Sequence, residues 1–175
     1  MSVLTIFIQK AIVQGICILY GALGEIMTEK SGNLNLGIPG IMYMGGIAGL
    51  MGAFLYEKDN PNPNAFIGVL ISFVCAFACA MIGGLIYSIL TITLRVNQNV
   101  TGLALTIFGT GFGNFFGGSL IKLVDSDVPS ITLTATSGFF SKTLPFAGKL
   151  GWFGKLFLSY GFLAYLAVII AFAAS

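Results

Sequence analysis

The sequence predicts an all-α integral membrane protein, a polytopic helical bundle with about five transmembrane spans and a Gly/Pro-rich break between the first two. Five apolar stretches occur within 175 residues, and each is close to the roughly 20 residues that a membrane span needs. The composition agrees, because 57% of the residues are hydrophobic and 8% are charged, whereas soluble domains carry roughly 25% charged residues. A water-soluble domain could not hide so much apolar surface.

The first two predicted spans cover residues 3–24 and 36–56. The first has no small-residue cleavage site of the A-x-A type, so we expect a retained helix rather than a signal peptide. The second is rich in Gly and Met and is followed by the octet EKDNPNPN at residues 57–64. No helix would carry this octet into hydrocarbon, so it predicts a water-exposed turn.

The third and fourth predicted spans cover residues 66–94 and 100–121. The third is uncharged up to Arg95, and its length exceeds the hydrocarbon thickness, which implies tilt or protrusion. Arg95 marks its end, and only residues 96–99 then separate it from the fourth. The two helices are therefore expected to be antiparallel neighbours joined by a tight turn.

Residues 122–155 are predicted to form an extramembrane loop, because they combine Gly, Pro, Thr and charged residues. The last span is expected to begin near residue 156. It is still apolar where the sequence ends and has no flanking charge. We therefore expect the chain to be part of a longer protein.

The connection between the first two spans, residues 24–40, contains four glycines, one proline and two asparagines. This composition predicts non-helical backbone, which is tolerated at membrane depth only against protein or a water-filled path. One interpretation is a broken helix that lines a translocation path. The other is an ordinary solvent-exposed loop in which Glu25, Glu29 and Lys30 are hydrated and the glycines mark helix ends.

One face of the fourth span is nearly free of bulky side chains. On a helical wheel, six residues fall within an arc of about 100°: Gln98, Gly102, Thr106, Gly109, Gly113 and Gly117. The spacing of the last three glycines predicts close packing of another helix.

Amide side chains cluster at the start of the same span. A lipid-facing amide is costly unless it finds a partner, so Asn97, Gln98, Asn99 and Asn114 should face protein or water. Asn97 and Gln98 are candidates for a solute path or an interface, and either one could instead cap the helix.

Several classes of chemistry lack candidates in the sequence. Histidine is absent, and Cys17, Cys75 and Cys79 lie in apolar runs, where a thiol behaves as a small hydrophobe. We therefore predict no metal site and no cofactor. There is no basic block that would bind nucleic acid. There is also no G-x-x-x-x-G-K-[ST] loop, so the chain is expected not to be an enzyme.

Two motifs resemble permease subunits of ABC importers, in the branched-chain amino acid, ribose and nucleoside group. The first consists of Gly24, Glu25, Thr28, Glu29, Gly32, Asn35, Leu36, Gly37, Gly40 and Met42, and the second of Val96, Asn97, Gln98, Val100, Gly102, Ala104, Leu105 and Thr106. The chain looks most like the second of two paired permeases in nucleoside or simple-sugar importers. One departure is Pro39, where the family commonly has an acidic residue.

The resemblance implies that residues 1–175 form a single permease domain, the N-terminal part of a longer permease in the cytoplasmic (inner) membrane. The partners it implies are an ABC ATPase subunit, a second permease, an extracytoplasmic solute-binding lipoprotein and the lipid bilayer. It also places Arg95 on the cytoplasmic side and residues 122–155 outside, although counting lysines favours the opposite orientation.

The solute path is predicted to involve Asn33, Asn35, Gly37, Asn97 and Gln98, because neutral amides suit a polar uncharged solute. Glu25 and Glu29 are assigned a structural role, holding the broken segment through Lys30 or a partner subunit. Gly102, Gly109, Gly113 and Gly117 are assigned to helix packing. A secondary carrier or channel, or a structural membrane subunit, is the alternative function.

Overall fold

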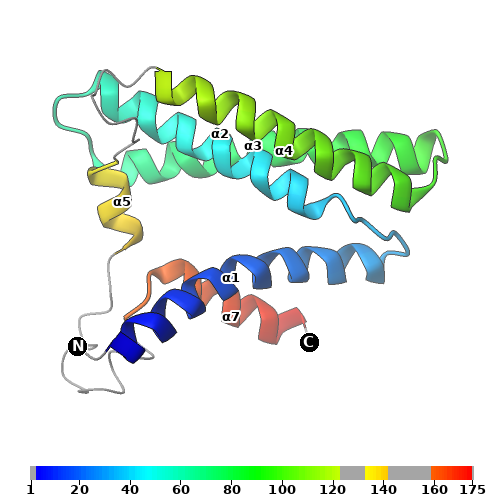
Figure 1. The fold of residues 1–175 in the computed structure, drawn as a ribbon, viewed down its shortest axis with the longest axis horizontal. Coiled ribbons are helices and arrows are strands. Elements are labelled where there is room, and N and C mark those ends of the chain that lie inside the picture. Colours follow the sequence, from blue (N-terminus) through cyan, green and yellow to red (C-terminus); the bar gives the residue numbers. More distant parts are fainter. Residues whose placement is uncertain (1–2, 123–132, 142–158, 175) are drawn as a thin grey trace. The chain divides into compact units, whose positions relative to one another are not determined.

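The computed structural model describes residues 3–122, 133–141 and 159–174, and every regular element in these ranges is helical (Figure 1). The elements are α1 (Val3–Lys30), α2 (Ile38–Asp59), α3 (Ala65–Ser88), η1 (Ile89–Thr93), α4 (Gln98–Lys122), α5 (Ala135–Phe140) and α7 (Phe162–Ala174). The predicted all-α fold is confirmed.

Four helices are long and apolar enough to cross a membrane: Val3–Lys30, Ile38–Asp59, Ala65–Thr93 and Gln98–Leu120. A fifth apolar helix, Phe162–Ala173, is shorter, and the start predicted for it near residue 156 lies outside the described residues. Large side chains on the long helices are open to the surroundings, as at Ile107 and Phe115, which are 73% and 70% exposed. A polytopic membrane bundle accounts for this surface, because exposed apolar side chains are stable in contact with lipid but unfavourable in contact with water.

The break between the first two spans is shorter than the sequence suggested. Non-helical backbone was predicted from residue 24, but α1 continues to Lys30 and only residues 31–37 are unwound. The reason is that residues 25–30 include good helix formers, and Lys30 in the last turn complements the helix dipole. We call residues 31–37 the connector.

Local chemistry fixes both ends of the connector. Gly32 has φ +84°, its N–H donates to the Glu29 carbonyl at 2.9 Å, and the Asn33 N–H donates to the Thr28 carbonyl at 3.0 Å. This is a Schellman helix end, which favours glycine at the left-handed position. At the other end, Pro39 lies in the first turn of α2, where its missing N–H costs nothing.

The next two interruptions are also short. The predicted octet turn is narrower than expected, because α2 extends through Asp59 and the α2–α3 turn comprises residues 60–64. Its last residue, Asn64, caps α3 by accepting from the Phe66 N–H at 3.0 Å. The α3 helix ends in the π turn η1, and residues 94–97 lead into α4, which runs antiparallel to α3 as predicted (Figure 1).

Helix α2 packs against both α3 and α4. Its interface with α3 uses small residues: a Cβ built on Gly45 would lie 3.1 Å from the Ala76 carbonyl, and one on Gly49 would lie 3.0 Å from the Ser72 carbonyl. Cys75 packs in the same interface against Gly52. In lipid, the hydrophobic effect does not drive two helices together. The close approach of α2 and α3 instead provides dispersion contacts that stabilise their packing.

Glu57, in the last turn of α2, holds the start of α5. Its carboxylate accepts from the backbone N–H groups of Thr134, Ala135 and Thr136 at 2.9, 3.4 and 2.8 Å. Thr136 is buried and contacts Gly68 on α3. The rest of the predicted 122–155 loop, apart from Lys122 and residues 133–141, lies outside the described residues.

The chain divides into two compact units, residues 1–24 with 138–175 and residues 25–137. In the first unit, the Tyr20 hydroxyl of α1 donates to the Leu163 carbonyl of α7 at 2.8 Å. The Phe140 and Phe162 rings stack there, with centroids 6.0 Å apart. The second unit contains the connector, the α2–α4 bundle and all the predicted site residues.

Candidate functional site

The candidate site is the connector together with the side chains that bind its backbone. These side chains come from the end of α1, from α3 and from the first three turns of α4. The structure therefore brings together parts of the sequence more than 60 positions apart.

Gln98, the first residue of α4, binds the connector with both atoms of its amide. Its Oε1 accepts from the Leu34 N–H at 2.9 Å, and its Nε2 donates to Asn33 Oδ1 at 3.2 Å. One side chain thus serves as acceptor and donor for adjacent connector residues, which fixes their spacing from α4.

Asn35 is buried, with 5% of its surface exposed, and it organises the second half of the connector. Its Oδ1 accepts from the Gly37 N–H at 2.9 Å, which closes an Asx-type turn leading into α2. Its own N–H donates to Glu25 Oε1 at 3.2 Å. Glu25 therefore contacts the connector backbone directly, whereas Glu29 is exposed and contributes its carbonyl to the end of α1.

Two hydroxyl groups to which the sequence analysis gave no role in the site complete the set. Tyr87 of α3 donates to the Leu34 carbonyl at 2.6 Å, and Thr106 of α4 donates to the Leu36 carbonyl at 2.7 Å. The sequence offered one signal for Tyr87, which is a tyrosine within an apolar span. A phenol hydroxyl in such surroundings needs a hydrogen-bond partner. Thr106 had been placed on the glycine-rich face, but without a role.

Asn97 and Gln98 have separate functions, although they are adjacent. Asn97 is exposed, and its Oδ1 accepts from the N–H groups of Asn99 and Val100 at 3.0 and 3.3 Å. This is an N-cap of α4. Gln98 makes the contacts to the connector, so the structure brings Asn33, Asn35, Gly37 and Gln98 together, with Asn97 at the adjoining helix end.

The glycine face of α4 lies against the connector and α2. A Cβ on Gly102 would stand 2.7 Å from Leu36 N, one on Gly109 would overlap the backbone of Gly40, and one on Gly113 would overlap the Tyr43 ring. Gly117 faces Ile47 at 3.4 Å. Next to these contacts, the Tyr43 hydroxyl donates to Asn114 Oδ1 at 3.1 Å. Only hydrogen fits at the first three positions without a shift of the neighbouring atoms.

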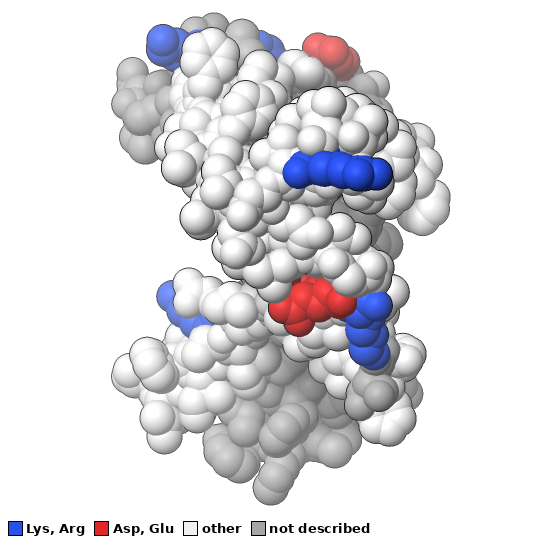
Figure 2. All heavy atoms as spheres, turned by 90° about the vertical axis from the view of Figure 1, so that its right-hand side faces the viewer, with Lys and Arg blue, Asp and Glu red and all other residues white. Residues whose placement is uncertain are grey.

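This arrangement holds an irregular backbone in a fixed shape. Backbone groups of Leu34, Asn35, Leu36 and Gly37 are hydrogen-bonded to side chains, as is required where water is scarce. The described residues include no group of three His, Cys, Asp or Glu that could bind a metal. On the face in Figure 2, charged residues form small separate patches within a mostly uncharged surface.

Comparisons with known proteins point to a single family. The family model described as "Branched-chain amino acid transport system / permease component" matches residues 7–175. A protein of Haloferax volcanii that is named as a glucose ABC transporter permease, TsgC13, is 28% identical over 132 residues, which are 75% of this chain and 37% of that protein.

The guanosine ABC transporter permease NupQ of Bacillus subtilis is 23% identical over 172 residues, which are 98% of this chain and 51% of that protein. The chain thus spans about half the length, or less, of these curated relatives. No solved structure matches it significantly.

Proposed function

The chain belongs to the family of branched-chain amino acid transport system permease components, and from this premise we propose that it is a transmembrane subunit of an ATP-driven importer. In this proposal it forms, with a second permease, the path for a polar uncharged solute, a nucleoside or a simple sugar. It lies in the cytoplasmic membrane as a multi-pass protein.

The connector is the observation that carries this proposal. It is unwound backbone between two helices of membrane-spanning length, and side chains from α1, α3 and α4 satisfy its polar groups. Irregular backbone of this kind is typical of transporters, in which interrupted helices border the solute site. A purely structural subunit would need the glycine face but not a shaped break.

The solute class is argued from the relatives and from the chemistry of the connector. One relative is named for glucose and the other for guanosine, and both solutes are uncharged and rich in hydrogen-bonding groups. The connector region offers amides, hydroxyls and backbone groups. Such groups orient neutral polar ligands.

We assign the predicted path residues two roles. The backbone of the connector, with Asn33 and Gly37, forms the wall of the path. Asn35 and Gln98 hold that wall in shape through the bonds described above, and Asn97 sets the start of α4. Glu25 acts with them as a structural residue.

The energy source and the remaining subunits are also proposals. The chain has no nucleotide-binding loop of the G-x-x-x-x-G-K-[ST] type, so hydrolysis is assigned to an ABC ATPase partner and solute delivery to an extracytoplasmic binding lipoprotein. Copurification from membranes should recover a P-loop ATPase. Uptake that follows an ion gradient and ignores ATP would favour a secondary carrier instead.

The site is tested by replacing Asn35 with Leu in the intact importer. Asn35→Leu leaves the Gly37 N–H without its acceptor, so we expect uptake of labelled nucleoside or sugar to fall about tenfold or more, with an unchanged amount of protein in the membrane. Asn35→Asp keeps the acceptor oxygen and should retain more uptake.

The matched control is Asn62→Leu, in the exposed α2–α3 turn. It should leave uptake close to that of the unmodified importer. Equal uptake by the Asn35 and Asn62 variants would remove Asn35 from the site.

A further inference from the structure

Polar side chains follow one side of α4 away from the connector. Thr106, Thr110 and Asn114 are spaced by four residues, so they lie on one face of the helix. They extend over about 12 Å of the helix axis, and the Thr106 hydroxyl is bonded to the Leu36 carbonyl of the connector. We call these three residues the polar stripe. It begins at the candidate site and continues along the membrane-spanning helix.

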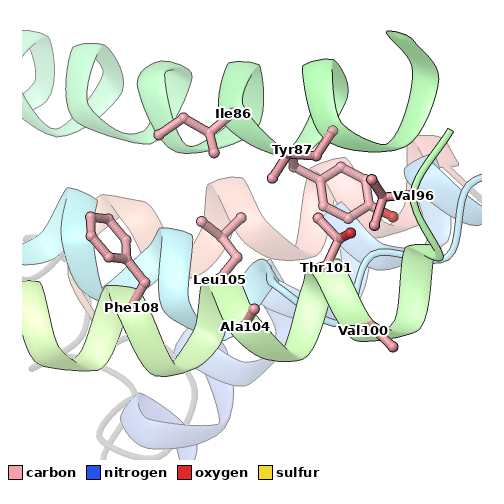
Figure 3. Close-up of a pocket in the computed structure, with 9 residues that line it drawn as sticks. Ile86, Tyr87, Val96, Val100, Thr101, Ala104, Leu105 and Phe108 are labelled. Atoms are coloured by element: carbon pink, nitrogen blue, oxygen red, sulfur yellow. The ribbon is translucent and has the colours of Figure 1, made fainter. Parts of the chain in front are cut away.

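The side of α4 that faces α3 is different. Figure 3 shows Leu105 and Phe108 there, opposite Ile86 of α3. Apart from Thr101, which is buried, every polar side chain between residues 100 and 118 belongs to the polar stripe. Polar groups are therefore concentrated on one face of α4 rather than spread around the helix.

Tyr43 of α2 adds a phenol hydroxyl to the stripe. This hydroxyl donates to Asn114 Oδ1 at 3.1 Å. The Tyr43 ring lies against Gly113, where an added Cβ would overlap the ring carbons, so the packing of α2 on α4 fixes the position of the hydroxyl. Tyr43 is nevertheless 41% exposed, and Asn114 is exposed. The pair is thus held in place and open to the surroundings.

The Tyr43–Asn114 pair retains hydrogen-bonding groups that the protein does not use. Asn114 Nδ2 carries two N–H donors, and it makes no hydrogen bond to any residue that the structure describes. The Tyr43 oxygen can still accept. Asn114 lies within the span Gln98–Leu120, about 24 Å along the axis from its start. Since an unpaired amide that faces hydrocarbon is costly, the pair should face water or another polar group.

We propose, on the basis of the importer assignment above, that Tyr43 and Asn114 form a second contact point for the solute, on a path that follows the polar stripe away from the connector. The pair offers N–H donors and an acceptor oxygen, which suit a hydroxyl or carbonyl group. Residues 38–56 of α2 and 98–121 of α4 include no charged residue. A charged solute would find no counter-ion there, whereas an uncharged polar solute needs none.

The first test measures whether the stripe contacts water in the intact importer. With Cys17, Cys75 and Cys79 replaced by Ala, Asn114→Cys is treated with a charged, membrane-impermeant methanethiosulfonate, which reacts with thiolates. Because a thiol in hydrocarbon does not ionise, we expect Asn114→Cys to be labelled about tenfold or more faster than Phe115→Cys. Phe115 is the matched control, since it is the next residue along the same helix, is 70% exposed and lies on a different side.

The second test measures solute contact. Tyr43→Phe keeps the ring against Gly113 and removes only the hydroxyl. With a labelled nucleoside and a labelled simple sugar as probes, we expect the KM of the transported probe to rise about fivefold. The maximal rate should change less than about twofold. Tyr56→Phe removes a hydroxyl that is bonded in the exposed α2–α3 turn and should leave KM unchanged.

Labelling of Asn114→Cys as slow as that of Phe115→Cys would overturn the proposal, because lipid or the second permease would then cover the pair. An unchanged KM for Tyr43→Phe would overturn it as well. If the unmodified assembly takes up neither probe, the importer assignment itself has failed. The two failures are thereby distinguished.

Discussion

The connector and the α2–α3 turn are interruptions of similar composition that the molecule holds in different ways. The turn, residues 60–64, is bonded to its own flanking helices: Asn60 Nδ2 donates to the Tyr56 carbonyl at 2.8 Å, and the Asn64 N–H donates to the Tyr56 hydroxyl at 3.2 Å. The connector is bonded to residues of α1, α3 and α4. Asn35 and Gly37 are buried, whereas most of the turn is exposed.

This difference shows that the composition of a segment between two helices does not by itself decide whether its backbone is exposed to water or covered by other helices. Both segments are rich in asparagine, with proline or glycine. What distinguishes the connector is the presence of polar side chains on distant spans at positions that meet its backbone. An exposed turn needs no such partners because water supplies them.

The largest expected effect comes from separating the connector from α4. Gly102→Ala would place a methyl group 2.7 Å from Leu36 N and 2.9 Å from Gly37 N, both backbone atoms. Since the backbone must move, we expect a loss of about 3 kcal/mol in the free energy of unfolding and no uptake. Thermal unfolding in detergent and an uptake assay measure the two effects.

The matched control for Gly102 is Gly111 on the same helix, which has no atom within 4 Å of an added Cβ. Gly111→Ala should raise stability by up to about 1 kcal/mol through helix propensity. Equal stability of the two variants would mean that the connector does not lie against α4.

A smaller effect is expected when the amide bridge is removed. Gln98→Leu leaves the Leu34 N–H and Asn33 Oδ1 without their partners, so we expect a loss of about 2 kcal/mol and a clear decrease in uptake. Asn60→Leu removes an exposed bond in the turn and should cost at most about 0.5 kcal/mol. If denaturation experiments showed a larger loss of stability for Asn60→Leu than for Gln98→Leu, the contrast between the connector and the turn would be wrong.

Two tyrosines allow the comparison to be repeated with the loss of a single oxygen atom. Tyr87→Phe leaves the Leu34 carbonyl without its donor, for which we expect a cost of about 1.5 kcal/mol. Tyr56→Phe removes an acceptor from the exposed turn, where water replaces it, so a change within about 0.5 kcal/mol is expected. Urea or thermal melts of both variants check the difference.

The smallest effect should come from two threonines of α4. Thr106→Val removes the donor to the Leu36 carbonyl, and we expect a cost of about 1 kcal/mol. The Thr110 hydroxyl donates only to carbonyls of its own helix, at Thr106 and Ile107, so Thr110→Val should be nearly neutral. Similar losses for both would show that the Leu36 bond contributes little.

Much of the fold could be predicted from the sequence, because each helix that crosses the bilayer needs an apolar stretch long enough to span the hydrocarbon. The positions of such stretches therefore give the positions of the helices. The long helices and the tight α3–α4 turn follow from it. The end of α1 was misplaced because residues 24–30 are polar, and polarity was taken as a sign of unwinding. The left-handed residue Gly32, rather than the charges before it, ends the helix.

The candidate site could be predicted only in part. The glycine face and the amides were visible as patterns, since both are unusual in a span. The partners of the connector were less visible, because a tyrosine and a threonine are unremarkable in an apolar helix until the opposing carbonyl is known. The sequence also left open whether Asn97 or Gln98 caps α4, because this depends on the direction in which the backbone enters the helix.

Glu57 stands at the carbonyl end of one helix and at the amide end of another. A negative charge in the last turn of α2 opposes the dipole of that helix, and the same charge favours the dipole of α5. With six residues, α5 is too short to persist alone. Its folding is thus conditional on a carboxylate nearly eighty positions earlier in the sequence, so that an acidic residue on a membrane helix dictates the conformation of a segment outside that helix.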